Sequence, residues 1–393
     1  MKALSERKIV LVLAALSAIT PLAIDMYLPS ITLMSKELNS TEPLISISIS
    51  IFFLGLALGQ LFGGPISDAY GRKPIVLIGL GIFCSTSFLI LFVNNVYMLW
   101  ILRFLQAFGG GVATVNVSAT VRDFFSGSES ARIFSMIGSI SILAPLLAPA
   151  MGLGLVSLFG KWEVIFIFLC VYSLLAFWFY NACFAASVNK KRAKITPIKN
   201  YFEILKSGKP MILIAALVIS GCGFYAILTS ASVIYIDYFK LPQSMFVVCF
   251  SVNIISLMAA TRINMRLVKK ISPLKLLKFG LFAQIGLSIL MMILHNTTQI
   301  IFMAPLIALF VGTLGFVFGN ALSIILEYFP RTSASANAVI GVLQYGFGAA
   351  AGMLANFFHE DGSLFALMCV ILSSSLIGTA VLIFGVTRSK NLA

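Results

Sequence analysis

The sequence predicts an all-α membrane protein with twelve transmembrane helices in two six-helix halves. Of its 393 residues, 60% are apolar and only 10% are charged, whereas about a quarter of the residues in soluble proteins are charged. Apolar runs of about 20 residues, the length that a helix needs to cross a bilayer, recur along the whole chain. No polar stretch is long enough to form a separate soluble domain.

Twelve apolar segments are expected to span the membrane. The first begins near residue 9 and is too long for the apolar part of a usual signal peptide, so we interpret it as an uncleaved span. The polar gaps between most segments are short, which favours antiparallel helix pairs. The spans are predicted at residues 9–29, 44–65, 74–94, 97–118, 133–157, 163–185, 210–235, 244–263, 276–295, 300–326, 335–357 and 364–386.

The basic residues favour one orientation of these spans. If both termini are cytoplasmic, 23 of the 27 lysines and arginines fall in inner segments. The outer loops hold Lys36, Lys161 and Lys240, and Arg103 lies within a span. Because positive residues concentrate on the cytoplasmic side, we expect a multi-pass membrane protein with both termini in the cytoplasm. Basic loops against an anionic leaflet also explain the net charge of +14 without nucleic-acid binding.

The longest inner gap divides the spans six and six. We therefore predict an N-terminal half at residues 1–185, a basic cytoplasmic linker at 186–209 and a C-terminal half at 210–393. SDAYGRKP joins the second and third spans, and the similarly basic NMRLVKKISP joins the eighth and ninth. This similarity is a weak sign of an internal repeat. Two related six-helix halves are typical of transporters whose halves rock about a central site.

Asp25 and Arg103 are the two charged residues that stand clear of the span ends, and charges at membrane depth are functional candidates. At a rise of 1.5 Å per residue, Asp25 lies about 24 Å along its helix and Arg103 about 9 Å below the outer face. In a hydrocarbon core about 30 Å thick, the two lie at similar depth. They are expected to pair or to communicate across a cavity, and a purely structural ion pair is the alternative.

The surroundings of Asp25 indicate a hydrated, moving segment. Pro21 and Pro29 have no N–H, so the carbonyl groups of Ser17 and Asp25 lose their helical partners and need water, a side chain or a ligand. Desolvation opposes the charge on a carboxyl group and a nearby cation favours it. The sequence therefore predicts that Asp25 loads and unloads a proton as its exposure changes.

The loop GGPISDAYGRKP carries a candidate gate. We expect residues 63–65 to end the second span, Gly71 to permit a tight turn, and Arg72 and Lys73 to anchor the inner face. Asp68 suggests a specific role for this loop, because the positive-inside rule accounts for basic residues in a cytoplasmic loop but not for an acidic one. It could cap a helix or pair with a basic residue of a neighbouring helix, forming a cytoplasmic latch, and a solvated turn is the alternative.

The fifth span contains a second candidate gate, in the stretch GSISILAPLLAPAMGLG. Pro145 and Pro149 lie one turn apart among small residues, which bend a helix and allow close helix approach. A kinked packing helix explains this pattern as well as a gate does.

Uncharged polar side chains within the spans suggest a large, mostly neutral cavity. Such a cavity with one acid suits lipophilic neutral or cationic compounds, although polar residues in spans more often bond to other helices. The candidate substrate-binding residues are Gln60, Gln106, Asn116, Tyr225, Asn253, Asn320, Gln344 and Tyr345.

Other classes of protein fit the sequence poorly. The six cysteines fall in apolar runs without metal-type spacing, so we expect no metal and no cofactor. The two histidines, His295 and His359, lie in different outer loops and no nucleophile–base pairing is evident, which argues against an enzyme. A channel would need a ring of charge or a filter-like stretch of carbonyl groups.

Taken together, these stretches resemble the major facilitator superfamily over nearly the whole chain. GPISDAYGRK (64–73) resembles its inner-loop signature, LWILRFLQAFGGGVA (99–113) its fourth-span motif around a buried arginine, and LAPLLAPAMG (143–152) its fifth-span antiporter motif. AIDMYLP (23–29) resembles the first span of twelve-span drug/proton antiporters of the Bcr/CflA type, associated with bicyclomycin and chloramphenicol resistance. VIYIDYF (233–239) and NAVIGVLQYGFGAAAG (337–352) are similar to that subgroup's seventh and eleventh spans.

The resemblance implies the major facilitator fold and export of small drugs or toxic compounds in exchange for protons. It implies that Asp25 is the protonated group, that Arg103 is its electrostatic partner, and that Asp68, Arg72 and Lys73 make inner-gate contacts. We expect a monomer in the lipid bilayer whose partners are a small-molecule substrate and protons.

The sequence departs from the family pattern at three places. Ala144 stands where many members have glycine, and Glu163 stands where an arginine is common. The first-span stretch LSAITPLA lacks the second acid of some related exporters, which argues against a two-carboxylate mechanism. Export of an endogenous metabolite, such as an amino-acid derivative or siderophore, and uncoupled facilitated transport remain as alternatives.

Overall fold

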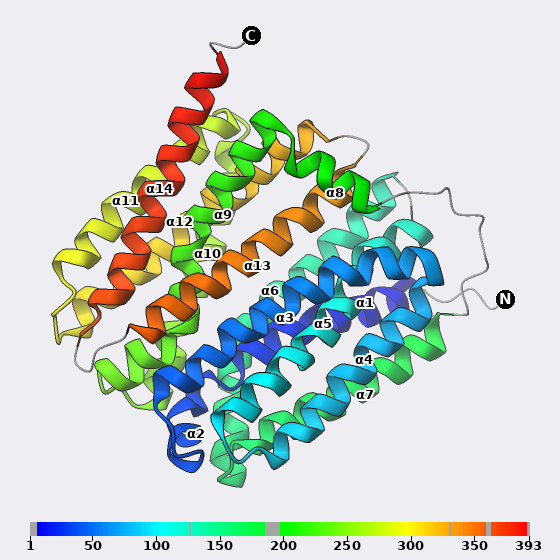
Figure 1. Cartoon of the computed structure of the whole chain (residues 1–393), viewed down its shortest axis with the longest axis vertical. Coiled ribbons are helices and arrows are strands. Elements are labelled where there is room, and N and C mark those ends of the chain that lie inside the picture. Colours follow the sequence, from blue (N-terminus) through cyan, green and yellow to red (C-terminus); the bar gives the residue numbers. More distant parts are fainter. Residues whose placement is uncertain (1–5, 126, 185–196, 330–331, 359–362, 391–393) are drawn as a thin grey trace. The chain divides into compact units, whose positions relative to one another are not determined.

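The computed structural model describes residues 6–125, 127–184, 197–329, 332–358 and 363–390, and these are almost entirely helical (Figure 1). In this described part, twelve helical segments are long and apolar enough to cross a membrane. Each of them overlaps one predicted span, so the prediction of a twelve-span all-α membrane protein is confirmed. Residues 186–196 of the predicted linker and His359 lie outside the described residues.

The chain divides into two compact units, which we describe separately. The first comprises Met1–Thr41 and Ile51–Ile195, and the second comprises Glu42–Ser50 and Thr196–Ala393. The helices up to the linker are α1 (Glu6–Asp25), α2 (Ile31–Glu37), α3 (Glu42–Tyr70), α4 (Arg72–Leu89), α5 (Val96–Phe124), α6 (Gly127–Phe159) and α7 (Glu163–Cys183). Those after it are α8 (Pro197–Leu205), α9 (Gly208–Thr229), α10 (Gln243–Leu267), α11 (Pro273–Ile293), α12 (Ile300–Glu327), α13 (Ser333–Phe357) and α14 (Phe365–Lys390).

The first span runs further than predicted. Helix α1 ends at Asp25, a short 3₁₀ turn covers Leu28–Ser30, and α2 then extends the span to Glu37. Pro29 lies in the first turn of the 3₁₀ segment. A proline is tolerated there because the first N–H groups of a helix have no intrahelical acceptor. Pro21 lies inside α1, and the interruption after Asp25, which contains Pro29, does not end the span.

The prediction that residues 63–65 end the second helix is wrong, because α3 continues to Tyr70. Its glycines serve helix packing instead. A Cβ atom on Gly63 would lie 2.8 Å from the Cα atom of Val112, and one on Gly59 would overlap a backbone carbonyl group of α5. Small residues at four-residue spacing let two membrane helices approach closely, and this explains the pattern better than a helix break does.

A single residue joins α3 to α4. Gly71 has φ 100° and ψ 151°, a conformation that is essentially restricted to glycine, and its N–H donates to the carbonyl oxygen of Ser67 over 3.0 Å. Helix α4 begins at the next residue, Arg72. The tight turn predicted at Gly71 is confirmed.

The core of the second unit includes one side chain from the segment predicted as linker. Ile204 of α8 is 1% exposed and packs in a cluster with Leu213 and Ile214 of α9, Leu277 of α11 and Ile340 of α13. Residues 197–205 therefore form a helix with one face buried against this unit.

We predict that Gly71→Ala destabilises the protein by about 1–3 kcal/mol, because alanine is strained at this backbone conformation. The measurement is the apparent unfolding temperature of the detergent-purified protein. Gly81→Ala on α4 is the matched control: a Cβ atom there meets nothing within 4 Å, so its unfolding temperature should equal or slightly exceed that of the wild type. Equal unfolding temperatures for the two variants would contradict the prediction.

Candidate functional site

Asp25 is the last residue of α1 and is 4% exposed. The chain leaves the α-helix directly after it, at Met26 and Tyr27, before the 3₁₀ turn begins at Leu28. Its Oδ1 atom is buried, and within the described part of the chain the carboxyl group has no hydrogen-bond or ion-pair partner. An uncompensated carboxylate at such a site is strongly disfavoured, so burial favours the neutral form of this carboxyl group.

Helix α6 fixes the backbone next to Asp25. A Cβ atom on Gly152 would overlap the carbonyl oxygen of Met26, so only glycine allows α6 to lie this close to the end of α1. Gly152 lies in the same helix as Pro145 and Pro149, through which α6 continues unbroken. The two prolines predicted as a gate thus belong to the helix that contacts the Asp25 segment.

Arg103 of α5 is fully buried, and aromatic rings surround its guanidinium group. Its Cζ atom lies 4.5 Å from the ring centroid of Tyr27, 4.3 Å from that of Phe52 and 5.9 Å from that of Phe166. Desolvated cation–π contacts contribute about 2 kcal/mol or more. The rings therefore offset part of the cost of burying this charge.

Hydrogen bonds hold Arg103 in one orientation. Its Nη1 atom donates to Oε1 of Gln106 over 2.7 Å, and Nε2 of Gln106 donates to Oγ of Ser87 over 2.7 Å. The Ser87 hydroxyl in turn donates to the carbonyl oxygen of Phe83. Gln106 is fully buried, so in this arrangement it positions Arg103, whereas we predicted a substrate contact.

The structure brings Asp25 and Arg103 into one unit but does not pair them. In the described residues no ion pair within 4.0 Å joins the two side chains. Tyr27, two residues after Asp25, lies against the guanidinium group instead. Sequence reasoning missed this tyrosine, and the signal available for it was an aromatic residue two positions after the acid of the predicted span 9–29.

The α3–α4 turn carries a second cluster of charges. Nη1 of Arg72 lies 2.6 Å from Oδ1 of Asp68, and its Nε lies 3.3 Å from Oδ2 of Asp123 at the end of α5. Nη1 also donates to the Ser67 hydroxyl over 2.8 Å and to Oδ1 of Asn116 over 3.5 Å. Asp68 thus pairs with the first residue of the next helix, and Asp123 is a member of the cluster that the sequence did not reveal.

Two of the predicted residues near this turn have other contacts. Nζ of Lys73 donates to the carbonyl oxygen of Asn181 on α7 over 2.9 Å. Asn116 is 1% exposed and donates to the carbonyl oxygen of Val112, so it contributes to the packing of α5 and to the charge cluster.

In the second unit, two of the predicted amides bond to other helical segments. Asn253 donates to the Tyr235 hydroxyl over 3.1 Å, and Asn320 donates to Oδ1 of Asn264 over 2.8 Å. These bonds link α10 to the π-helical turn Val233–Tyr238 and α12 to α10.

The remaining candidates lie on α9, α13 and α3. The rings of Tyr225 and Tyr345 meet edge to face with centroids 6.0 Å apart, and a Cβ atom on Gly348 would overlap the Tyr225 ring. Gln344, next to Tyr345, is 7% exposed, and Gln60 in the first unit is half-buried.

The chain is similar to known transporters along most of its length. The model of the Major Facilitator Superfamily matches residues 13–353. A bicyclomycin resistance protein homolog of Haemophilus influenzae is 31% identical over 93% of this chain and 94% of its own length. A chloramphenicol resistance protein of Pseudomonas aeruginosa is 33% identical over 41% of this chain and 38% of its own length.

The similarity extends to solved structures. The crystal structure of the nucleoside transporter NupG aligns with a TM-score of 0.75 over 96% of this chain and 99% of that protein, with 14% sequence identity. At this identity the likeness concerns the fold alone.

We predict that Gly152→Ala lowers the stability of the protein by about 1–3 kcal/mol, because the added methyl group overlaps the Met26 carbonyl oxygen and separates α6 from α1. The apparent unfolding temperature measures the effect. Gly154→Ala, two residues further on, is the matched control because a Cβ atom there meets nothing within 4 Å. Loss of stability in both variants would point to helix flexibility and not to the close approach at Met26.

Proposed function

The chain belongs to the major facilitator superfamily, in its Bcr/CflA-type branch, and we propose that it exports small lipophilic drugs or toxic compounds by proton-coupled antiport. Membership of this family of transporters also confirms the expectation that the protein is not an enzyme. The observation that carries the proposal is Asp25, a buried carboxyl group without a partner in the described part of the chain. Relatives named for bicyclomycin and chloramphenicol resistance support the substrate class.

In this proposal Asp25 binds one proton per cycle. When the site is closed to water, the proton neutralises a carboxyl group that nothing else compensates. When the site opens to water, hydration stabilises the carboxylate and the proton leaves. Inward movement of positive charge is driven by the membrane potential, which supplies about 2.3 kcal/mol per charge per 100 mV.

Arg103 acts on Asp25 through space in this mechanism. Its position is fixed by Gln106 and by the rings of Tyr27 and Phe52, so its positive charge is present throughout the cycle. A fixed cation at similar depth favours release of the proton from Asp25 without forming an ion pair that would hold the carboxylate permanently charged.

The cluster around Arg72 is proposed as the inner gate. Asp68 and Asp123 share this arginine, and the pairs are partly exposed, with side-chain exposures of 17% for Arg72 and 35% and 44% for the two acids. Partly exposed ion pairs are weak, each contributing about 1 kcal/mol or less. Such contacts are suited to being broken and re-formed in each cycle, together with the Lys73 contact to α7.

The substrate is proposed to contact uncharged residues during alternating access of the two halves. Tyr225, Tyr345 and Gln344 offer aromatic faces and an amide, and Gln60 is the half-buried candidate of the first half. We further propose that the protein works as a monomer in the inner membrane with both termini in the cytoplasm, since the lysine and arginine distribution favours this orientation.

We predict that Asp25→Asn abolishes transport driven by a pH gradient, because asparagine cannot bind and release a proton. The measurement is uptake of a fluorescent cationic drug into proteoliposomes, with and without an imposed gradient. Asp25→Glu should retain part of the coupled transport, and Asp237→Asn, which removes an acid bonded to Lys240, is the matched control. Gradient-driven transport by Asp25→Asn at the wild-type rate would remove Asp25 from the mechanism, and wild-type transport that ignores the gradient would indicate an uncoupled facilitator.

A further inference from the structure

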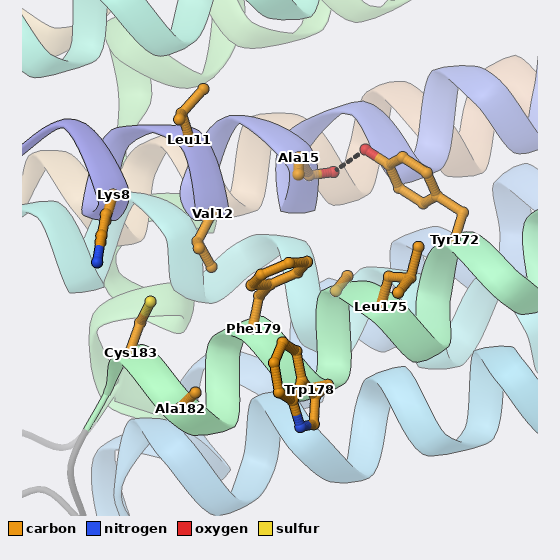
Figure 2. Close-up of a pocket in the computed structure, with 11 residues that line it drawn as sticks. Lys8, Leu11, Val12, Ala15, Tyr172, Leu175, Trp178, Phe179, Ala182 and Cys183 are labelled. Carbon is orange, nitrogen blue, oxygen red and sulfur yellow. Dashed lines mark hydrogen bonds between the residues drawn. The ribbon is translucent and has the colours of Figure 1, made fainter.

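A groove between α1 and α7 is separate from the Asp25 and Arg103 side chains (Figure 2). Its volume is about 640 Å³, within the range of small-molecule sites in proteins. Its walls are apolar, with Leu11, Leu175 and Trp178 all more than half exposed. We call this feature the α1–α7 groove, lined by Lys8, Leu11, Ala15, Tyr172, Phe179 and Ala182 together with their neighbours.

Small residues create the groove. Ala15 on α1 and Ala176 and Ala182 on α7 line the groove with small side chains. The ring of Phe179 forms a wall (Figure 2). An apolar space of this kind is unfavourable for water. In a bilayer, where its exposed apolar residues face hydrocarbon, an alkyl chain is the occupant that its walls favour.

The two ends of the groove differ in chemistry. Lys8 lies at one end, in the first turn of α1, and Tyr172 lies at the other (Figure 2). The Tyr172 hydroxyl already donates its proton to the carbonyl oxygen of Ala15 over 2.8 Å, so this donor is not available to a ligand. The distance along α1 from Lys8 to Ala15 is about 10 Å at 1.5 Å per residue. The groove therefore presents one cationic end and an apolar path leading away from it.

Charge decides which amphiphile fits. Among the described residues that line the groove, Lys8 is the only one with a charged side chain. An anionic headgroup would meet an ammonium group that shares the groove lining with no carboxylate, as far as the described residues go, whereas a zwitterionic headgroup would bring its own ammonium group close to Lys8. Basic residues near a membrane surface attract anionic lipids in this way.

We propose that the α1–α7 groove binds an anionic phospholipid, with one acyl chain along Phe179 and Ala15 and the phosphate against the ammonium group of Lys8. The site holds α1 against α7 at the start of the first span. It is independent of the transported substrate and of proton coupling.

The test is lipid retention by the purified full-length protein, measured by native mass spectrometry. The probes are phosphatidylglycerol and phosphatidylethanolamine with identical acyl chains. The wild type should retain one phosphatidylglycerol in preference to phosphatidylethanolamine. Lys8→Gln should weaken phosphatidylglycerol binding about fivefold, the factor expected for one basic residue at the membrane surface. Ala182→Phe should remove the bound lipid by filling the groove.

Two variants serve as matched controls. Lys36→Gln removes an exposed lysine at the opposite end of the same span, and Val171→Phe adds a ring at an exposed site of α7 outside the groove. Both should retain phosphatidylglycerol as the wild type does. Equal retention of the two lipids by the wild type, equal loss in both lysine variants, or unchanged retention by Ala182→Phe would each overturn the proposal. Unfolding temperatures near that of the wild type show that the variants are folded.

Discussion

Burial of an arginine and of a carboxyl group that do not pair with each other is the constraint on which the first half of this protein depends. Arg103 is compensated in part by the Gln106 amide and by the rings of Tyr27, Phe52 and Phe166, while its Nε and Nη2 atoms have no hydrogen-bond partner among the described residues. Asp25 has no such compensation within the described residues. Because a buried charge is tolerated only when it is paired or neutralised, the carboxyl group is the member of this arrangement whose charge can change.

The packing around Asp25 keeps this arrangement in place and explains the local backbone. Helix α1 ends at the acid, Pro29 lies in the 3₁₀ turn that follows, and Gly152 allows α6 to contact the Met26 carbonyl group. A break in regular helix at membrane depth is tolerated where it is buried in protein or lines a hydrated cavity. The end of α1 therefore lies next to α6, a helix that carries two prolines of its own.

Much of the fold could be predicted from the sequence, because the length of an apolar run is a local property. The twelve spans and the turn at Gly71 follow from composition and from the conformational freedom of glycine. The end of the second helix was predicted wrongly, because glycines that break a helix and glycines that pack against another helix look alike in one sequence. Gly59 and Gly63 are of the second kind.

The candidate site was only partly visible in the sequence. Asp25 and Arg103 could be identified because charge is rare in apolar spans. The partners of Arg103 could not, since Gln106 and Ser87 meet through side-chain conformations that depend on how α4 and α5 pack. Asp123 was hidden for the same reason: its contact with Arg72 joins residues 51 positions apart.

The central claim is that Asp25 is a neutral acid when its site is closed. Infrared spectroscopy of the purified protein at neutral pH tests it directly, because a protonated carboxyl group has a carbonyl stretch that a carboxylate and an asparagine amide lack. The wild type minus Asp25→Asn difference spectrum should show this band, and raising the pH with the site open should remove it. A difference spectrum that shows only carboxylate bands at neutral pH would contradict the account.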